Sequence, residues 1–262
     1  METKGPNTTN LLAISAHQDD IEIMAMDGIL KAFGSKKYAF YACVVGDGAN
    51  CYKAGKYSDI SDKEMVEQRN QEQTRAGQIG EYDGLYLLKH SRDYLFKNRE
   101  LVVKELAKLI SDINPDIVYT HNIFDRSETH RLITSMVVDA IMTMPEETRP
   151  RLLYGCEVFR SLDWLPERYK VTFDISDNRD LQLRLVGVYD TRAEQSKNYT
   201  KAIMGRKMAN AAFAACKEID DEERLLWYGI NLTPVIQKNI ALKDYCIKVL
   251  NDANKELLEG IE

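Results

Sequence analysis

The sequence of 262 residues has few of the features that mark exported or membrane-spanning proteins. Its five cysteines are odd in number, widely spaced and without a CxxC pair, which argues against a disulfide framework or a cysteine zinc site. It contains no run of about 18 apolar residues that could span a bilayer. The polar N-terminus also lacks the basic and apolar segments of a secretion signal. We therefore expect a cytoplasmic protein without a membrane span.

The sequence has fewer basic than acidic residues. Lysine and arginine number 35 against 41 aspartates and glutamates, which gives a net charge of −6 and a sequence pI near 5.4. This balance argues against broad attraction to nucleic acid or anionic membranes and leaves small molecules as partners. The hydrophobic content of 44% is enough for one large α/β domain or two small ones. We expect one domain with a tail.

Short apolar runs alternate with helical patterns through the first half of the chain. The runs have the length and the β-branched or aromatic content of buried strands, and they cover residues 11–16, 38–45, 84–88 and 116–120. The helical patterns cover about 22–34, 63–80, 98–113 and 130–144. Such alternation requires right-handed crossovers and predicts a Rossmann-like α/β fold, with a mostly parallel sheet and helices on both faces.

The second half of the chain has a less regular pattern. It predicts strands near 152–159 and 170–174, a helix after Ser176, and further helices around 195–216 and 238–259. We divide the chain into a domain over residues 1–215 and a C-terminal helical extension over residues 216–262, packed on the same domain.

Charged side chains collect where the first predicted strand meets the helix after it, at His17, Asp19, Asp20 and Glu22. In an open parallel sheet, ligands bind beyond the carboxyl ends of the strands, where the strand order reverses. If the order is 3-2-1-4, the fourth strand lies beside the first. The segment "HNIFDRSETHR" that follows the fourth strand would then face the first cluster across one crevice.

A divalent ion such as zinc suits this arrangement, since a catalytic zinc keeps three protein ligands and one open position. His17, Asp20 and His130 would form that set. Asp19 cannot easily point the same way as its neighbour Asp20, so it is free to act as a general base. The alternative is that the two aspartates only cap a helix, because carboxylates accept hydrogen bonds from its first amides.

These residues resemble the signatures of the PIG-L or LmbE-like family of zinc-dependent N-acetylglucosaminyl deacetylases. The family motif H-P-D-D-x-E is matched by residues 17–22, and D-x-H-P-D-H-R is matched by residues 125–131. Further agreements are the "GDG" at 46–48, the R-x-x-E of Arg69 and Glu72, and the later stretches "FDISD" and "IMGRKMANAAFA". The resemblance runs from about residue 10 to residue 214.

The resemblance implies that His17, Asp20 and His130 bind one zinc ion per chain, although other divalent ions would also suit the site. Asp19 would be the base that works with water activated by the metal.

Three more residues receive roles by the same resemblance. Arg69 and Asp93 would hydrogen-bond the hydroxyls of an amino sugar, and Glu22 would orient His17 from behind and raise its basicity.

The sequence departs from the family pattern at several positions. Gln18 replaces a proline, and Arg192 and Glu194 stand where many members have H-x-S-Q. Ser127 replaces a histidine thought to help the oxyanion or the leaving amine. A serine can donate one hydrogen bond but cannot act as a general acid near neutral pH, and loss of one transition-state donor typically costs about 10²- to 10³-fold in rate.

His121, at the end of the fourth predicted strand, has two interpretations. It either replaces the missing histidine from a different direction or caps the strand and bonds to backbone.

The sequence thus predicts a hydrolase, a metal-dependent N-deacetylase that removes an acetyl group from an N-acetylated amino sugar of the GlcNAc type or a related conjugate. A second hypothesis is a sugar-binding protein that keeps the pocket but has lost turnover through the change at Ser127. A third is a nucleotide-dependent transferase that uses the same crevice. The family resemblance also allows a homo-oligomer.

Overall fold

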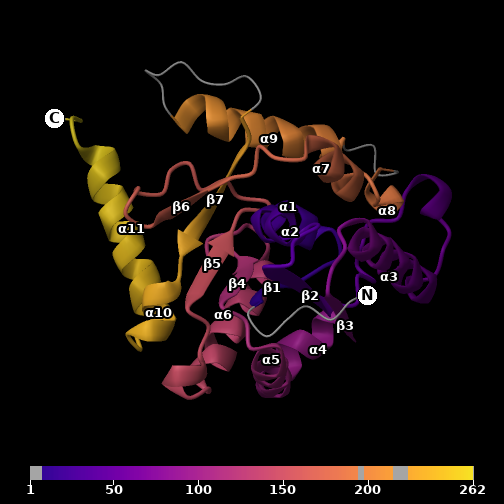
Figure 1. The fold of residues 1–262 in the computed structure, drawn as a ribbon, viewed down its shortest axis with the longest axis horizontal. Helices are drawn as coiled ribbons and strands as arrows, with labels where there is room; N and C mark the ends of the chain where they lie inside the picture. Colours follow the sequence, from indigo (N-terminus) through magenta and orange to yellow (C-terminus); the bar gives the residue numbers. More distant parts are fainter. Residues whose placement is uncertain (1–7, 194–197, 215–223, 262) are drawn as a thin grey trace.

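A seven-stranded sheet forms the centre of the molecule, with the strand order β3-β2-β1-β4-β5-β7-β6 (Figure 1). The computed structural model describes residues 8–193, 198–214 and 224–261. The strands are β1 (Thr9–Ser15), β2 (Tyr38–Gly46), β3 (Gly84–His90), β4 (Ile117–His121), β5 (Leu152–Cys156), β6 (Lys170–Asp174) and β7 (Leu226–Asn231). The first five strands pair in parallel, whereas β7 runs antiparallel to both β5 and β6.

Helices cover both faces of the sheet, as predicted. One face packs against α4 (Arg92–Lys97), α5 (Arg99–Ile113), α6 (Glu128–Met142), α10 (Thr233–Gln237) and α11 (Leu242–Leu258). The other face packs against α1 (Asp20–Met24), α2 (Met26–Ala32), α3 (Asp62–Ile79), α7 (Arg179–Val186) and α9 (Tyr199–Ala214). Short elements complete the described chain: α8 (Asp190–Ala193), η1 (Gly55–Tyr57) and η2 (Glu146–Thr148). None of the described helices is both long and apolar enough to cross a bilayer.

The central strand β1 explains why both faces must be covered. Its side chains alternate between the two apolar layers: Leu12 and Ile14 belong to one, and Leu11 and Ala13 to the other. All four are fully buried. A strand that is apolar on both faces needs helices on both faces, which is the arrangement of parallel α/β sheets.

The predicted order 3-2-1-4 is confirmed, and it determines where the site lies. β1 pairs with β2 on one side and with β4 on the other. The strand after β2 lies farther out on the first side, and the strand after β4 lies farther out on the second, so the strand order reverses at β1. The segments after β1 and β4 both emerge at the carboxyl edge of the sheet, at this switch point. Residues more than 100 positions apart in the sequence therefore meet there.

The strand β7 was not predicted. The segment from residue 216 on was expected to be a helical extension, yet residues 226–231 insert between β5 and β6, while α10 and α11 supply the expected helices. The run "LWYGIN" is short and almost fully buried, and short apolar runs do not distinguish strand from helix by periodicity. The predicted helix over 22–34 is also two helices, α1 and α2, that meet at Ala25.

Candidate functional site

Three side chains from the two segments converge at the carboxyl edge of the sheet. His17 follows β1, Asp20 begins α1, and His130 lies in the first turn of α6. The Nδ1 atom of His17 is 3.2 Å from Nε2 of His130 and 3.2 Å from Oδ2 of Asp20. The remaining distance, from His130 Nε2 to Asp20 Oδ2, is 3.4 Å. The residues predicted to bind a metal thus form one compact triangle of ligand atoms.

The triangle has the size that zinc requires. Ligand atoms at about 2.0–2.1 Å from a tetrahedral zinc ion stand about 3.3 Å from one another. The measured edges of 3.2, 3.2 and 3.4 Å match that value. Burial alone would raise the pKa of the Asp20 carboxyl, but the charge of His130 and the hydrogen bonds from His130 and His17 hold it well below its usual range, so Asp20 is a carboxylate. Two imidazoles and one carboxylate are a donor set that fits zinc.

Asp125 orients His130 from the side opposite the triangle. Its Oδ1 atom lies 3.2 Å from His130 Nδ1 and accepts a hydrogen bond from the backbone N–H of Ser127. Burial would raise the pKa of Asp125, but the hydrogen bonds from His130 and Ser127 lower it to about 2. A carboxylate behind a metal-ligating histidine sets its tautomer and ring orientation. The sequence analysis assigned no role to Asp125, although it is the first residue of the second motif.

His121 lies behind the triangle rather than in it. Its Nε2 accepts a hydrogen bond of 2.8 Å from the backbone N–H of Ala16, and its ring stacks on His130 at 3.8 Å between centroids. Burial and the charge of His130 lower the pKa of His121 well below its usual value, so the ring is neutral. The lone pair on Nε2 is already used. Of the two interpretations of His121, the structure contains the hydrogen bond with the backbone.

Glu22 is turned away from His17. Its carboxylate is fully buried and accepts hydrogen bonds from Gln73, Tyr82 and Tyr189 at 2.6–2.8 Å. Burial raises its pKa, although the tyrosine hydroxyls partly offset this. The structure therefore does not bring Glu22 to His17, and its contacts instead join α1 to α3, to Tyr82 after α3 and to Tyr189 between α7 and α8. The carboxylate behind a predicted metal ligand is Asp125, at His130.

Asp19 and Asp20 point apart, as predicted. Asp19 occupies the residue before α1 with φ of +81° and makes no side-chain capping bond. Such a left-handed conformation costs about 1–3 kcal/mol in a residue with a side chain. The Oδ2 atom of Asp20 bonds the backbone N–H of His17, which precedes the helix. The capping interpretation of the two aspartates is therefore wrong.

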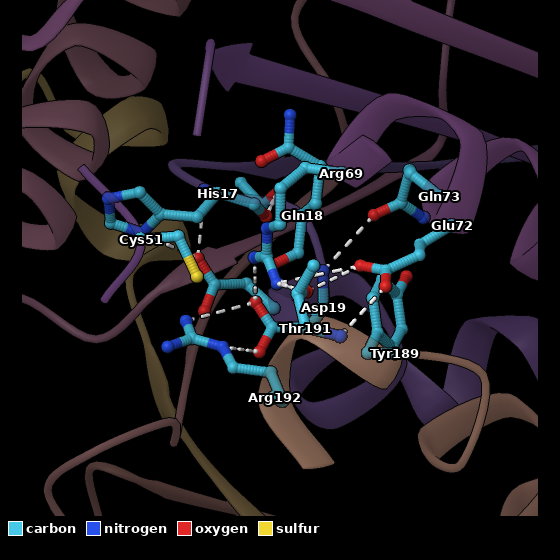
Figure 2. Close-up of polar contacts among 12 residues, drawn as sticks. His17, Gln18, Asp19, Cys51, Arg69, Glu72, Gln73, Tyr189, Thr191 and Arg192 are labelled. Atoms are coloured by element: carbon cyan, nitrogen blue, oxygen red, sulfur yellow. Dashed lines mark hydrogen bonds and ion pairs between the residues drawn. The ribbon is translucent and has the colours of Figure 1, made fainter. Parts of the chain in front are cut away.

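Two guanidinium groups hold the Asp19 carboxylate (Figure 2). Arg69 Nη2 donates to Oδ1 at 2.8 Å, and Arg192 donates from Nε to Oδ2 at 2.6 Å and from Nη2 to Oδ1 at 3.3 Å. The charge of Asp19 raises the pKa of Arg192, and burial opposes this. Arg69 is itself fixed, because it also donates to the carbonyl of Gln18 and to Thr191 Oγ1.

Ser127 is the N-cap of α6. Its hydroxyl oxygen accepts a hydrogen bond from the backbone N–H of His130, which starts the helix that carries this ligand. Ser127 does not line the pocket described below. Its position therefore explains how it supports His130, and a direct role in catalysis stays a prediction.

A pocket of about 350 Å³ opens beside the triangle. His17 and the three arginines Arg69, Arg92 and Arg192 line it, together with aromatic and small residues that include Tyr52, Phe159, Tyr199 and Gly46. Asp93 does not line this pocket. Its side chain is 80% exposed on α4, 3.5 Å from Lys97, whereas the preceding Arg92 faces the pocket. Arg92 had no signal in the sequence beyond its position after β3.

The comparisons with known proteins agree with this fold. Residues 12–141 match the family model described as PIG-L, GlcNAc-PI de-N-acetylase. No curated protein sequence matches the chain significantly.

Several solved structures share the fold. The 4-carboxy-2-hydroxymuconate hydratase GalB from Pseudomonas putida KT2440 superposes with a TM-score of 0.66 at 16% identity, covering 86% of this chain and 95% of that one. The N,N'-diacetylchitobiose deacetylase from Pyrococcus horikoshii gives 0.64 at 16% identity over 86% of both chains. The zinc-inhibited form of teicoplanin deacetylase Orf2 gives 0.59 at 13% identity, with 85% and 98% covered.

Proposed function

Because the chain belongs to the PIG-L family, whose model matches residues 12–141, we propose that it is a zinc-dependent hydrolase. It would remove the acetyl group from an N-acetylated amino sugar of the GlcNAc type or from a related conjugate. The fold alone does not select this reaction, since the similar structures include a hydratase as well as deacetylases.

The observation that carries the proposal is the triangle of ligand atoms with edges of 3.2–3.4 Å. His17, Asp20 and His130 would hold the zinc ion. When bound, zinc would acidify water and polarise an amide carbonyl at neutral pH. The pocket beside His17 is open to a ligand, so the ion would have both protein ligands and access to substrate.

The chain's own residues would act around that centre. Asp125 keeps His130 in the tautomer with Nε2 free for the metal, because it faces Nδ1. Asp19 is the carboxylate beside the site that does not bind the metal, and it would accept a proton from water and pass it to the leaving amine. Arg69 holds Asp19 in its strained conformation. Three of the five N–H groups of Arg69 bond Thr191, Gln18 and Asp19, and its Nε has no partner among the described residues, so a donor remains that would contact a sugar hydroxyl.

A second candidate is a sugar-binding protein with little or no turnover. Two observations favour reduced turnover: the hydroxyl of Ser127 accepts a helix amide where the family has a histidine, and both oxygens of Asp19 are engaged by arginines. Both candidates predict one metal ion per chain, whereas a nucleotide-dependent transferase predicts none.

Metal analysis tests the shared part of the two candidates. We expect about one zinc per chain in the purified protein and almost none in His17→Ala or His130→Ala. His90→Ala is the matched control, because His90 pairs with Glu105 outside the triangle and should retain the zinc. Unchanged zinc in both ligand variants would reject the metal site.

Acetate release separates the enzyme from the binding protein. The assay uses a panel of N-acetylated amino sugars with wild type and Asp19→Asn, at equal zinc content. Release that depends on Asp19 supports the hydrolase. Release that is absent in wild type, or equal in the two proteins, would refute it.

A further inference from the structure

The wall of the pocket beside the triangle is cationic although the whole protein is acidic. Its charged lining residues are Arg69, Arg92, Arg192 and one carboxylate, Asp47. Asp19, which pairs with Arg69 and Arg192, is 6% exposed, and Glu128 pairs with Arg92, but neither carboxylate lines the pocket. Asp20 and Asp125 are only 1% exposed and lie behind the lining. A chain with a net charge of −6 therefore presents mainly positive groups at this surface.

Arg192 is the arginine whose partner can change. Arg69 is 1% exposed and bound to Gln18 and Thr191 as well as to Asp19, so it is fixed in place. The side chain of Arg192 is 17% exposed and projects from the four-residue helix α8. Its guanidinium carbon also lies 5.4 Å from the centroid of the Tyr199 ring.

The bonds from the two arginines restrict the role proposed for Asp19. Arg192 spans both carboxylate oxygens, and Arg69 adds a third donor, so three of the about four lone pairs of the carboxylate are occupied. A carboxylate that takes a proton from water must offer one of its lone pairs to the pocket. A partly buried guanidinium that separates from its carboxylate needs another anionic partner, because an unpaired buried charge costs several kcal/mol. An anionic group on the ligand would be such a partner.

Arg92 offers a second anchor for the same group. It lines the pocket from α4 and pairs with Glu128 at 2.9 Å, with both side chains about half exposed or more. Exposed pairs of this kind contribute only about 0–1 kcal/mol, so Arg92 is easily diverted to a ligand. Guanidinium groups bind carboxylates and phosphates in the two-pronged geometry that Arg192 uses with Asp19.

We propose that Arg192 selects substrates that carry a carboxylate or phosphate besides the acyl amide, and that it exchanges Asp19 for this group when the substrate enters. This inference rests on the proposed function for the amide, but the anion preference is a property of binding. The proposal accounts for Arg192 at a position where many family members have H-x-S-Q.

The test is calorimetric titration of the zinc-loaded protein with three matched ligands: N-acetylglucosamine, N-acetylmuramic acid and N-acetylglucosamine 6-phosphate. The first ligand is neutral, the second carries a carboxylate and the third carries a phosphate. Comparison of the two charged ligands shows whether the pocket prefers a carboxylate or a phosphate. We expect at least one charged ligand to bind wild type about tenfold or more tightly than the neutral sugar. Arg192→Gln should reduce this advantage to about threefold or less, with the zinc content unchanged.

Arg168→Gln is the control for the change in net charge, because Arg168 pairs with Asp252 and Glu256 far along the chain and does not line the pocket. It should keep the full advantage. If Arg192→Gln does not fold, Arg192→Lys replaces it, since lysine keeps the charge but loses the two-pronged geometry and should also reduce the advantage.

Two results would overturn the inference: equal affinity of wild type for all three ligands, or an advantage that survives in the Arg192 variant. Acetate release is measured separately, which keeps the two proposals distinguishable. Arg192-dependent anion binding without acetate release refutes the hydrolase alone. Acetate release with no anion preference refutes the role of Arg192 alone.

Discussion

Two sides of one pocket are built in different ways. The histidine side consists of His17, Asp20, His130 and Asp125, and the arginine side consists of Asp19, Arg69 and Arg192. The histidine side draws only on the segments after β1 and β4, which are neighbours in the sheet. The arginine side joins α1, α3 and α8, which come from three parts of the chain and lie on one face of the sheet (Figures 1 and 2).

We infer from this difference that the histidine side binds the metal and that the arginine side selects the ligand. On the histidine side Asp20, His130 and Asp125 are buried, only His17 is partly exposed, and the three ligand atoms are spaced for an ion. On the arginine side Arg192 projects from a four-residue helix, and we propose that a ligand anion replaces its ion pair with Asp19. We expect changes on the histidine side to affect metal binding and changes on the arginine side to affect turnover and ligand choice.

The largest effect is expected for Asp19→Asn. The amide keeps the size of the side chain but cannot accept a proton at neutral pH, so turnover should fall about 10²- to 10⁴-fold while zinc content stays unchanged. Steady-state acetate release and metal analysis on the same preparation measure this. Asp112→Asn, an exposed aspartate on α5, is the control and should match wild type. Loss of zinc in Asp19→Asn would mean that the two sides are not separate.

Asp125→Asn should weaken zinc binding about 10- to 100-fold, because it removes the carboxylate that orients His130. Competition with a chelator gives the affinity. Glu22→Gln is the matched change at a buried carboxylate that contacts Tyr82 and Tyr189 rather than a ligand. Its zinc affinity should remain within about twofold of wild type. A loss of affinity in Glu22→Gln and none in Asp125→Asn would reverse our assignment.

His121→Phe distinguishes the two interpretations of His121. The variant keeps a ring against His130 but leaves the backbone N–H of Ala16 without its acceptor, which should cost about 1–3 kcal/mol of unfolding free energy. Denaturant unfolding measures this. Turnover per folded, zinc-loaded molecule should stay within a few-fold of wild type. A drop of 100-fold or more would instead support the catalytic interpretation.

The smallest effect concerns Lys207, in α9, which donates a hydrogen bond to Gln182 of α7. Burial lowers the pKa of Lys207 from 10.5 to about 7. The unfolded chain therefore binds this proton more tightly than the folded one, and stability rises with pH from about 7 toward 10.5. Between pH 6 and 8 the gain is about 1 kcal/mol. Lys207→Met should lose it, so the variant's stability relative to wild type should be higher at pH 6 than at pH 8. A difference independent of pH would contradict this.

The strands β1 to β4, their order and the three ligand residues could be predicted because their signals are local. Each strand is an apolar run, and each predicted ligand lies in a segment that follows a strand at the carboxyl edge. The strand β7 could not be predicted in the same way, since its six residues become a strand only through pairing with β5 and β6. Glu22 and Asp93 show the same limit. A family motif assigns a position along the chain, but the direction of a side chain depends on its neighbours.

The amino-acid sequence by itself determined that His17, Asp20 and His130 would come together, because parallel strands place the segments that follow them at one edge. Only the tertiary structure decided that Asp125 rather than Glu22 stands behind a ligand, and that Arg192 holds Asp19 from 173 positions away. Ion pairs of this kind depend on how helices from separate segments pack, and no spacing within the chain encodes that geometry.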